Sequence, residues 1–328
     1  MSLIEKTSKG LYCSIGDFFI DPTKKVDKAL ITHAHSDHAR KGHNQYICQQ
    51  NSKPLLQSRL GKNNYHGMDY GESIGINGVK CSFHPAGHVI GSAQIRVEYK
   101  GEVWVISGDY KLDNDGVCTP FEVVKCHTFI TESTFGMPIY QWEDQSIVYK
   151  RINNWWKQNA SLGIPSVLYA YSLGKAQRIL KHLNKSIGKI FAHQSITAIN
   201  RVLNDAGLYK EEALDIDDLE QDFSRALLIT PSRTLQSSWG KHFTEASVAA
   251  ASGWLATSVG RSRMICDTGF VLSDHADWYG LVDTVLATEA DTVYVTHGYE
   301  SILSQYLASE HGLDAHPLEH EIQESRDE

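Results

Sequence analysis

The six residues from 33 to 38 read His-Ala-His-Ser-Asp-His and place three imidazoles and a carboxylate in one short stretch. Zinc and similar divalent cations prefer neutral imidazole nitrogen and carboxylate oxygen as ligands. The stretch follows an apolar run at residues 29–32 that is typical of a buried strand. Alternate side chains of an extended chain point the same way, so we expect His33, His35 and Asp37 to converge while the last histidine turns aside. Ordinary surface residues are the alternative, but so dense a cluster favours a metal site.

Further candidate ligands stand just past apolar runs, each with a glycine nearby. His88 lies in a glycine-flanked turn, Asp109 follows residues 103–106, and His297 follows residues 292–296. A glycine at such a place lets two backbone segments approach closely. Any one of these residues is usually an ordinary loop residue. Together with the first cluster they become candidate metal ligands.

Motifs later in the chain complete a recognisable order. Residues 131–136 read Thr-Glu-Ser-Thr-Phe-Gly, residues 273–277 read Ser-Asp-His-Ala-Asp, and residues 295–298 read Val-Thr-His-Gly. The ordered set resembles the metallo-β-lactamase fold. The later motifs are similar to those of its β-CASP nucleases, which include the mRNA 3′-end cleavage endonuclease and RNase J. The match runs over nearly the whole chain, and within the group it most resembles the ligase-associated DNA exonucleases.

The resemblance implies an α/β fold: an αββα metallo-β-lactamase sandwich with an inserted parallel-sheet α/β β-CASP domain. The expected division is residues 1–135 and 262–328 for the sandwich and 136–261 for the insertion, with the active site in a cleft between them. The insertion itself shows alternating helix and strand patterns, which favour a parallel sheet. Its expected helices and strands are 144–160, 166–171, 172–184, 189–192, 226–230 and 248–251.

The resemblance also implies two divalent metal ions, most readily Zn²⁺ with Mn²⁺ as the alternative. One would be held by His33, His35, His88 and Asp109. The other would be held by Asp37, His38, Asp109 and His297, so that Asp109 is shared. Asp21 matches an aspartate of the family and is expected to orient a metal-site histidine.

Glu132 and His275 are the expected acid–base pair. A histidine can protonate the leaving oxygen of a phosphodiester, and a carboxylate bound to its other ring nitrogen would fix the tautomer. A plain salt bridge and a buried polar residue are the alternatives. Contacts to substrate phosphates are expected where strands lead into helices, because backbone N–H groups there favour anions. These candidates are Ser133, Thr134, Ser172, Gly174, Lys175, Ser252 and Gly253.

The net charge of −8 does not exclude a polyanionic substrate. Residues 211–222 contribute −7 and residues 319–328 contribute −4, which leaves +3 for the rest of the chain. A content of 41% hydrophobic and 21% charged residues is that of a globular protein. No apolar run reaches the length of a membrane-spanning helix, and no signal-peptide pattern opens the chain. We therefore expect a cytoplasmic protein without a membrane partner, and six cysteines that are free thiols.

Three functions remain open from the sequence. The first is a two-metal DNA exonuclease in repair, functionally associated with a DNA ligase and a helicase. The second is an RNA-processing endonuclease or exonuclease of the mRNA 3′-end processing type. The third is a non-catalytic nucleic-acid-binding scaffold, which the intact ligand set argues against. A small-molecule hydrolase of the same fold is disfavoured by the insertion and by Glu132 with His275.

Overall fold

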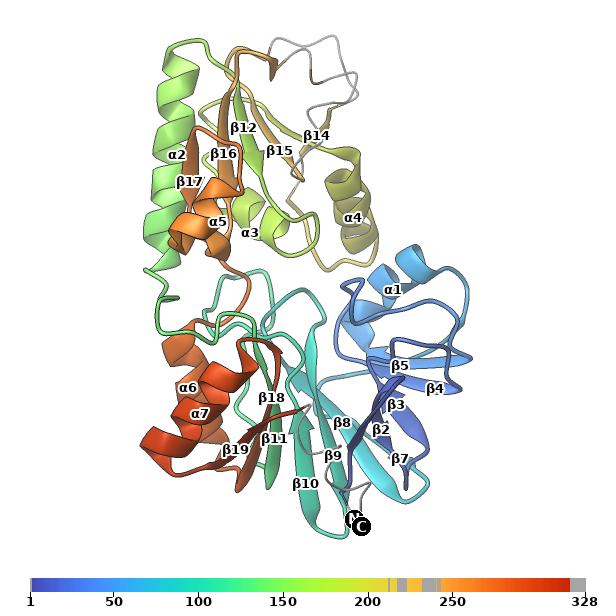
Figure 1. Ribbon diagram of the computed structural model, residues 1–328. Coiled ribbons are helices and arrows are strands. Elements are labelled where there is room, and N and C mark those ends of the chain that lie inside the picture. The colour runs from blue at the N-terminus through green and yellow to red at the C-terminus, as the bar shows by residue number, and fades with distance from the viewer. Residues whose placement is uncertain (1, 212, 217–222, 232–239, 241–242, 319–328) are drawn as a thin grey trace. The chain divides into compact units, whose positions relative to one another are not determined.

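The computed structural model describes residues 2–211, 213–216, 223–231, 240 and 243–318 (Figure 1). Most of the acidic segment at 211–222 and all of the acidic run at 319–328 therefore lie outside the described residues. The chain divides into two compact units, one made of Met1–Tyr140 with His275–Glu328 and the other of Gln141–Asp274. No helix among the described residues has the length and apolar character needed to cross a membrane.

The first sheet of the first unit runs in the order β1-β2-β3-β4-β5-β6. Its strands β3 to β6 pair in parallel, whereas β1, β2 and β3 form an antiparallel meander. A short 3₁₀ turn, η1, and the helix α1 connect β5 to β6. The bounds are β1 Glu5–Thr7, β2 Gly10–Cys13, β3 Phe18–Ile20, β4 Lys28–Ile31, β5 Gln45–Gln49, η1 Gln50–Ser52, α1 Lys53–Leu60 and β6 Asn64–Met68.

The second sheet of this unit has the order β19-β18-β11-β10-β9-β8-β7. Strands β7 to β10 pair antiparallel, and β10, β11, β18 and β19 pair in parallel. Chain segments far apart in sequence thus meet, because β11 lies beside β18 (Figure 1). The bounds are β7 Ser73–Ile76, β8 Val79–Pro85, β9 Ala93–Tyr99, β10 Glu102–Ile106, β11 Thr128–Ser133, α6 Trp278–Thr288, β18 Thr292–Gly298, α7 Glu300–His311 and β19 Asp314–Pro317.

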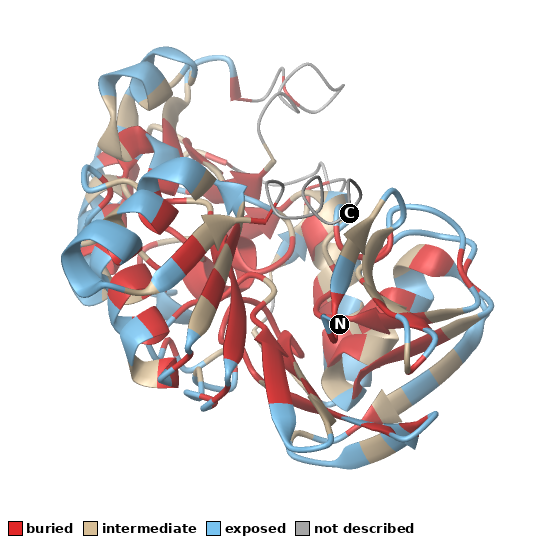
Figure 2. Cartoon of the chain, turned by 60° about the horizontal axis from the view of Figure 1, so that its bottom comes forward, coloured by how far each residue is buried: buried red, intermediate tan, exposed pale blue. Residues whose placement is uncertain are grey.

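Two apolar cores hold the first unit together. Phe18 and Leu30 of the first sheet share one core with Phe83 of the second, so the sheets pack against each other. The opposite face of the second sheet packs on α6 and α7 through residues such as Leu281 and Leu303. Figure 2 shows the result, with buried residues along the strands and exposed residues on the outer helix faces. Burial of this apolar surface is the main stabilising contribution.

The second unit is built on a sheet with the order β14-β13-β15-β12-β16-β17, in which every described pair is parallel. The predicted α/β class with parallel strands is therefore confirmed. The bounds are α2 Gln145–Ser161, β12 Ser166–Tyr169, α3 Lys175–His182, β13 Ile190–Ala192, α4 Gln194–Asp205, β14 Leu214–Asp215, β15 Leu227–Thr230, β16 Ser247–Ala251, η4 Gly253–Ala256, α5 Ser258–Ser262 and β17 Thr268–Phe270.

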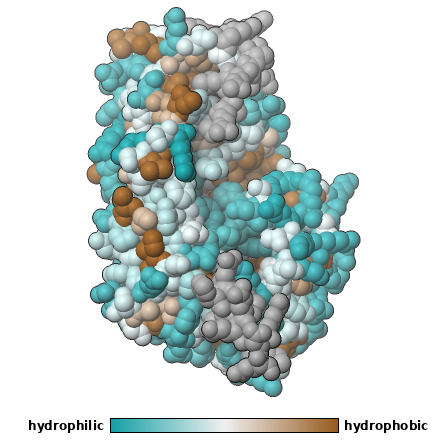
Figure 3. Space-filling view, viewed as in Figure 1, coloured by the Kyte–Doolittle hydropathy of each residue, from teal (hydrophilic) through white to brown (hydrophobic). Residues whose placement is uncertain are grey.

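The end of the second unit differs from the expected boundary at 261/262. β17 pairs with β16, so residues after 262 complete the parallel sheet and this unit extends to Asp274. At that end, the carboxylate of Asp274 contacts Nζ of Lys175 at 3.1 Å and Nη1 of Arg178 at 2.9 Å. All three side chains are buried. Apolar side chains also reach the surface of this unit near α5, where Val259 and Ile265 are exposed and Figure 3 shows hydrophobic surface.

Candidate metal centre

The histidine-rich stretch forms the loop that leaves the carboxyl end of β4. It does not continue as an extended strand, because the amide N–H of Ala39 donates to the carbonyl of His35 at 2.9 Å and closes a turn. The expected alternation is therefore wrong. His38 turns inward and is buried, whereas the side chain of Asp37 is 66% exposed.

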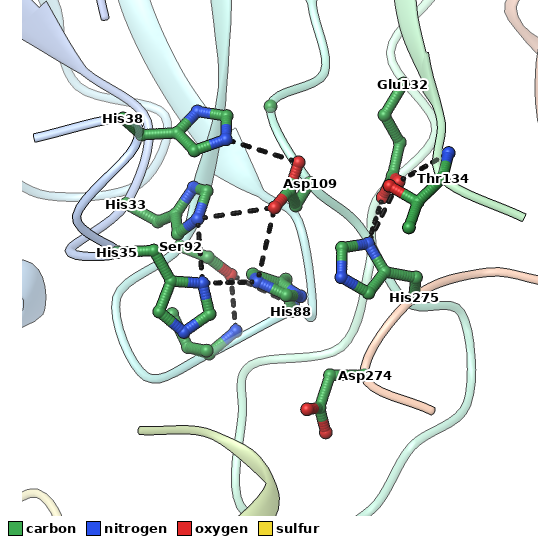
Figure 4. A network of polar contacts seen from close by, with 12 residues as sticks. His33, His35, His38, His88, Ser92, Asp109, Glu132, Thr134, Asp274 and His275 are labelled. Carbon is green, nitrogen blue, oxygen red and sulfur yellow. Dashed lines mark hydrogen bonds and ion pairs between the residues drawn. The ribbon is translucent and has the colours of Figure 1, made fainter. Parts of the chain in front are cut away.

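Four side chains from three separate segments converge in the first unit (Figure 4). Nδ1 of His35 lies 3.1 Å from Nε2 of His33 and 3.0 Å from Nε2 of His88. Oδ2 of Asp109 lies 3.5 Å from His33 Nε2 and 3.6 Å from His88 Nε2. One ligand atom from each of the four residues falls within 4.8 Å of the others. This is the donor set expected for one divalent metal.

The other predicted ligands lie on the far side of Asp109. Nε2 of His38 is 3.5 Å from Oδ1 of Asp109 and 3.7 Å from a carboxylate oxygen of Asp37. The ring of His297 lies 5.2 Å from that of His38, measured between centroids. His297 is exposed and has a φ of 53°, in the left-handed region. Asp109 thus touches both groups, but this second group is more open than the first.

The electrostatics of the centre suit a bound cation. Burial and the neighbouring imidazoles of His38 and His88 lower the pKa of His33 well below its usual value, which favours the neutral form that metals bind. Burial also lowers the pKa of His38, but the carboxylates of Asp109, Asp21 and Asp37 outweigh it and raise that pKa to about 10. Positive charge is therefore stabilised at this place. The nitrogen and carboxylate donors fit zinc or a similar divalent ion.

Glu132 and His275 lie beside this cluster. Nδ1 of His275 lies 2.9 Å from each carboxylate oxygen of Glu132, and the His275 ring lies 4.6 Å from that of His88, between centroids. The other ring nitrogen, Nε2, is on the side of His88 and Asp109 (Figure 4). Burial raises the pKa of Glu132, but the charge and hydrogen bond of His275 bring it below its usual value. The side chain of Glu132 is therefore an ionised acceptor that orients the imidazole.

The main chain of Tyr110 connects the two clusters. Its amide N–H donates to Oε1 of Glu132 at 2.7 Å, and its carbonyl accepts from the N–H of Ala276 at 2.8 Å. Tyr110 directly follows Asp109, which itself follows Gly108. Gly108 has a φ of 56°, and a Cβ there would lie 2.7 Å from Cβ of Thr32. Only glycine therefore lets the segment after β10, which carries Asp109, approach the histidine loop so closely.

Supporting residues fix the ligands. Asp21 accepts hydrogen bonds from Nδ1 of His38 at 2.7 Å and from the amide of Thr32 at 2.9 Å, the orienting position expected for it. Sequence reasoning missed Ser92, whose Oγ accepts from the amide of His88 at 3.0 Å. A small hydroxyl residue four positions after a glycine-flanked histidine was the available signal. For Tyr110 no side-chain pattern could have served, since its contacts with Glu132 and Ala276 are made by the main chain.

Most of the expected phosphate contacts are occupied within the chain. Ser133 is buried and its Oγ donates to the carbonyls of Thr296 and His297. Lys175 is paired with Asp274. Both groups are bonded within the chain and buried in this structure, and a phosphate contact through either of them stays a prediction.

The remaining candidates are also bonded internally. Oγ of Ser252 accepts from the amide of Trp254 at 3.3 Å, and Ser252 is buried together with Gly253. The amide of Gly174 donates to Gln177, and the amide of Thr134 donates to Glu132. Ser172 shares a hydrogen bond of 2.8 Å with Ser195 and is partly exposed. None of these contacts points to a phosphate site.

The chain is similar in sequence to parts of proteins that are named as nucleic-acid enzymes. It is 30% identical over 320 residues to a protein from Opitutus terrae named "Probable DNA ligase", and the match covers 94% of this chain and 30% of that protein. It is 28% identical over 180 residues to "Endoribonuclease YSH1" from Gibberella zeae, covering 52% of this chain and 20% of that protein. The chain thus spans less than a third of either relative. No family model matches it.

A solved structure shares the fold. A crystal structure of a protein of unknown function from Enterococcus faecalis V583 superposes with a TM-score of 0.60 at 13% identity, covering 84% of this chain and 76% of that one. At this identity the likeness concerns the fold alone. The histidine and aspartate groups could hold metal ions. The two relatives are named as a DNA ligase and an endoribonuclease, and this chain resembles a part of each.

Proposed function

We propose that this protein is a metal-dependent phosphodiesterase of the β-CASP type that trims DNA from an end. The observation that carries the proposal is the His275–Glu132 pair beside a convergent set of metal-ligand side chains. A structural metal site would not need an oriented imidazole next to it, whereas a hydrolase does. The second unit, Gln141–Asp274, would be the inserted β-CASP domain.

The residues divide the work between binding and proton transfer. His33, His35, His88 and Asp109 would hold one divalent ion, and Asp37, His38, Asp109 and His297 would hold a second. Bound Zn²⁺ or Mn²⁺ would neutralise charge on the phosphate oxygens and lower the pKa of a coordinated water. Because Nδ1 of His275 is bound by Glu132, its Nε2 is the nitrogen that carries the proton for the leaving oxygen.

DNA is favoured over RNA by the extent of the similarities. The ligase-named relative matches 94% of the chain, whereas the endoribonuclease matches 52%. The same relative supports a functional association with a DNA ligase, while an association with a helicase rests on the family resemblance alone. The endoribonuclease relative supports the second candidate, an RNA-processing nuclease.

End-labelled DNA and RNA oligonucleotides of one sequence test the proposal. Zn²⁺ or Mn²⁺ is added to metal-free protein, which is then incubated with oligonucleotides that carry the label at one end or at the other. We expect DNA to shorten progressively from one end. Internal cuts in RNA with intact DNA would select the second candidate. Binding of both nucleic acids without cleavage by protein that carries no stoichiometric metal would favour the scaffold and contradict the nuclease.

A further inference from the structure

Helix α1 borders the histidine loop and carries Arg59 near its C-terminal end. The guanidinium of Arg59 donates from Nη1 to the carbonyl of Ala34 and from Nη2 to the carbonyl of Ala39, the latter at 3.4 Å. Ala34 stands between the first two histidines of the motif, and Ala39 follows the third. One side chain thus holds both ends of the segment that presents the ligands.

This segment needs donors from elsewhere. It has left the sheet after β4, and Ala34 and Ala39 are buried. A buried carbonyl without a donor is costly, so the loop would not keep this shape unaided. An arginine suits the task because its planar guanidinium offers several N–H donors in a fixed geometry. Burial lowers the pKa of Arg59, and the nearby carboxylate of Asp37 raises it. Asp37, a candidate metal ligand, therefore also stabilises the charged form of Arg59.

The same helical segment borders the second ligand loop. Gly91 ends the turn that carries His88 and has a φ of 78°. A Cβ at this position would lie 2.3 Å from the amide nitrogen of Ser52, at the end of η1. The turn therefore packs directly on the start of α1. Two loops from different sheets, which supply His33, His35 and His88, are bounded by one short helical element.

We infer that Arg59 is a positioning residue of the metal centre, which holds the histidine loop in its ligand-presenting shape through Ala34 and Ala39. The inference rests on the proposed metal-binding function. Its effect should appear in metal affinity, because an unbraced loop must be ordered when the metal binds. Changes around metal ligands that act in this way typically weaken metal affinity by about 10- to 100-fold.

Arg59→Met tests the inference, because it removes the guanidinium and keeps most of the apolar stem. Zn²⁺ affinity is measured on the metal-free full chain by competition with a chromophoric chelator, and Co²⁺ binding by its visible spectrum. We expect about 10- to 100-fold weaker Zn²⁺ binding and a changed Co²⁺ spectrum, with far-UV circular dichroism like that of the wild type. Arg59→Lys keeps the positive charge but loses the planar, forked set of N–H donors, so its Zn²⁺ affinity should lie between those of the wild type and Arg59→Met.

Arg40→Gln is the matched control, since Arg40 is an exposed arginine next to the same loop. It should bind Zn²⁺ like the wild type. Wild-type affinity and an unchanged Co²⁺ spectrum in folded Arg59→Met would overturn the inference. If that variant does not fold, wild-type affinity in Arg59→Lys overturns it and intermediate affinity supports it. A wild-type protein that binds no stoichiometric Zn²⁺ or Co²⁺ would overturn the proposed function as well, so the two failures are distinguishable.

Discussion

Nδ1 of His275 lies 2.9 Å from both carboxylate oxygens of Glu132, although 143 residues separate them in the chain. The carboxylate stands near the end of β11, and the imidazole stands in the segment just before α6, so these two elements bring the pair together. Glu132 is buried, and the His275 side chain is 20% exposed. A buried anion thus holds a partly exposed ring, which is the arrangement that an oriented proton carrier requires.

Glu132→Gln should lower turnover by about 10²- to 10⁴-fold while the bound metal remains. The neutral amide no longer favours a proton on Nδ1 and stabilises the charged imidazole less. Single-turnover cleavage and elemental analysis of the same sample measure the two effects. Glu122→Gln is a control, because Glu122 contacts His84 in an exposed pair of the same unit.

His275→Ala should likewise lower turnover while the bound metal remains. Loss of metal from this variant would instead make His275 a ligand.

Asp109→Ala should abolish cleavage through loss of metal. Its two oxygens contact different histidines, Oδ2 toward His33 and Oδ1 toward His38, so its removal affects both expected positions. Elemental analysis after gel filtration and the end-label assay check this outcome. Asp69→Ala removes an exposed carboxylate of the same unit and should change neither quantity. Normal metal content with retained activity would refute a shared-ligand role for Asp109.

Asp274→Asn should destabilise the second unit by about 3–5 kcal/mol, because it leaves the buried cations of Lys175 and Arg178 without their anion. The shift of the urea unfolding midpoint measures the change. Glu211→Gln is the matched control, since Glu211 pairs with the exposed Lys185 on the surface, where such pairs contribute about 0–1 kcal/mol. Equal midpoints for the two variants would show that the buried group contributes no more than a surface pair.

Thiol labelling should distinguish Cys266 from the buried cysteines. Burial raises the pKa of Cys48, Cys81 and Cys126 to about 12 each, so at pH 8 only about 10⁻⁴ of each thiol is ionised. Burial also raises the pKa of Cys266, but this residue is partly exposed. An aromatic disulfide reagent at pH 8 should therefore modify Cys266 first, and faster as the pH rises. Cys266→Ser should remove this fast phase, and its persistence would contradict the prediction.

Local sequence patterns predicted the strands and helices of the second unit well, because apolar runs and helix caps depend on residues that are close in sequence. The strands expected at 166–171 and 189–192 correspond to β12 and β13, and Asp144 caps α2 by accepting from the amide of Ser146. The apolar side chains of that helix are not all covered. Trp156 is fully buried, but Ile147 is 42% exposed. A periodic pattern identifies a helix without specifying which marginal positions its neighbours cover.

Predictions failed where distant residues decide the outcome. Strand alternation misplaced Asp37 and His38, because a turn interrupts the extended chain. Lys175 and Ser133 are expected from local sequence to contact phosphate, yet their partners within the chain are Asp274 and backbone carbonyls of β18, far along the chain. No sequence pattern indicated the contacts of Arg59 with the histidine loop, because an arginine on a helix is usually a surface residue. Such tertiary hydrogen bonds are visible only once the segments have been brought together.

The contacts of Tyr110 with Glu132 and Ala276 use only the amide and carbonyl groups that every residue except proline possesses. No ordinary side-chain replacement at position 110 can delete them directly. These main-chain hydrogen bonds therefore fix the position of Asp109 relative to the segment that bears His275, and they tolerate substitution of the side chain at position 110. Divergent sequences could preserve the spacing of these two reactive groups while the residue between them varies.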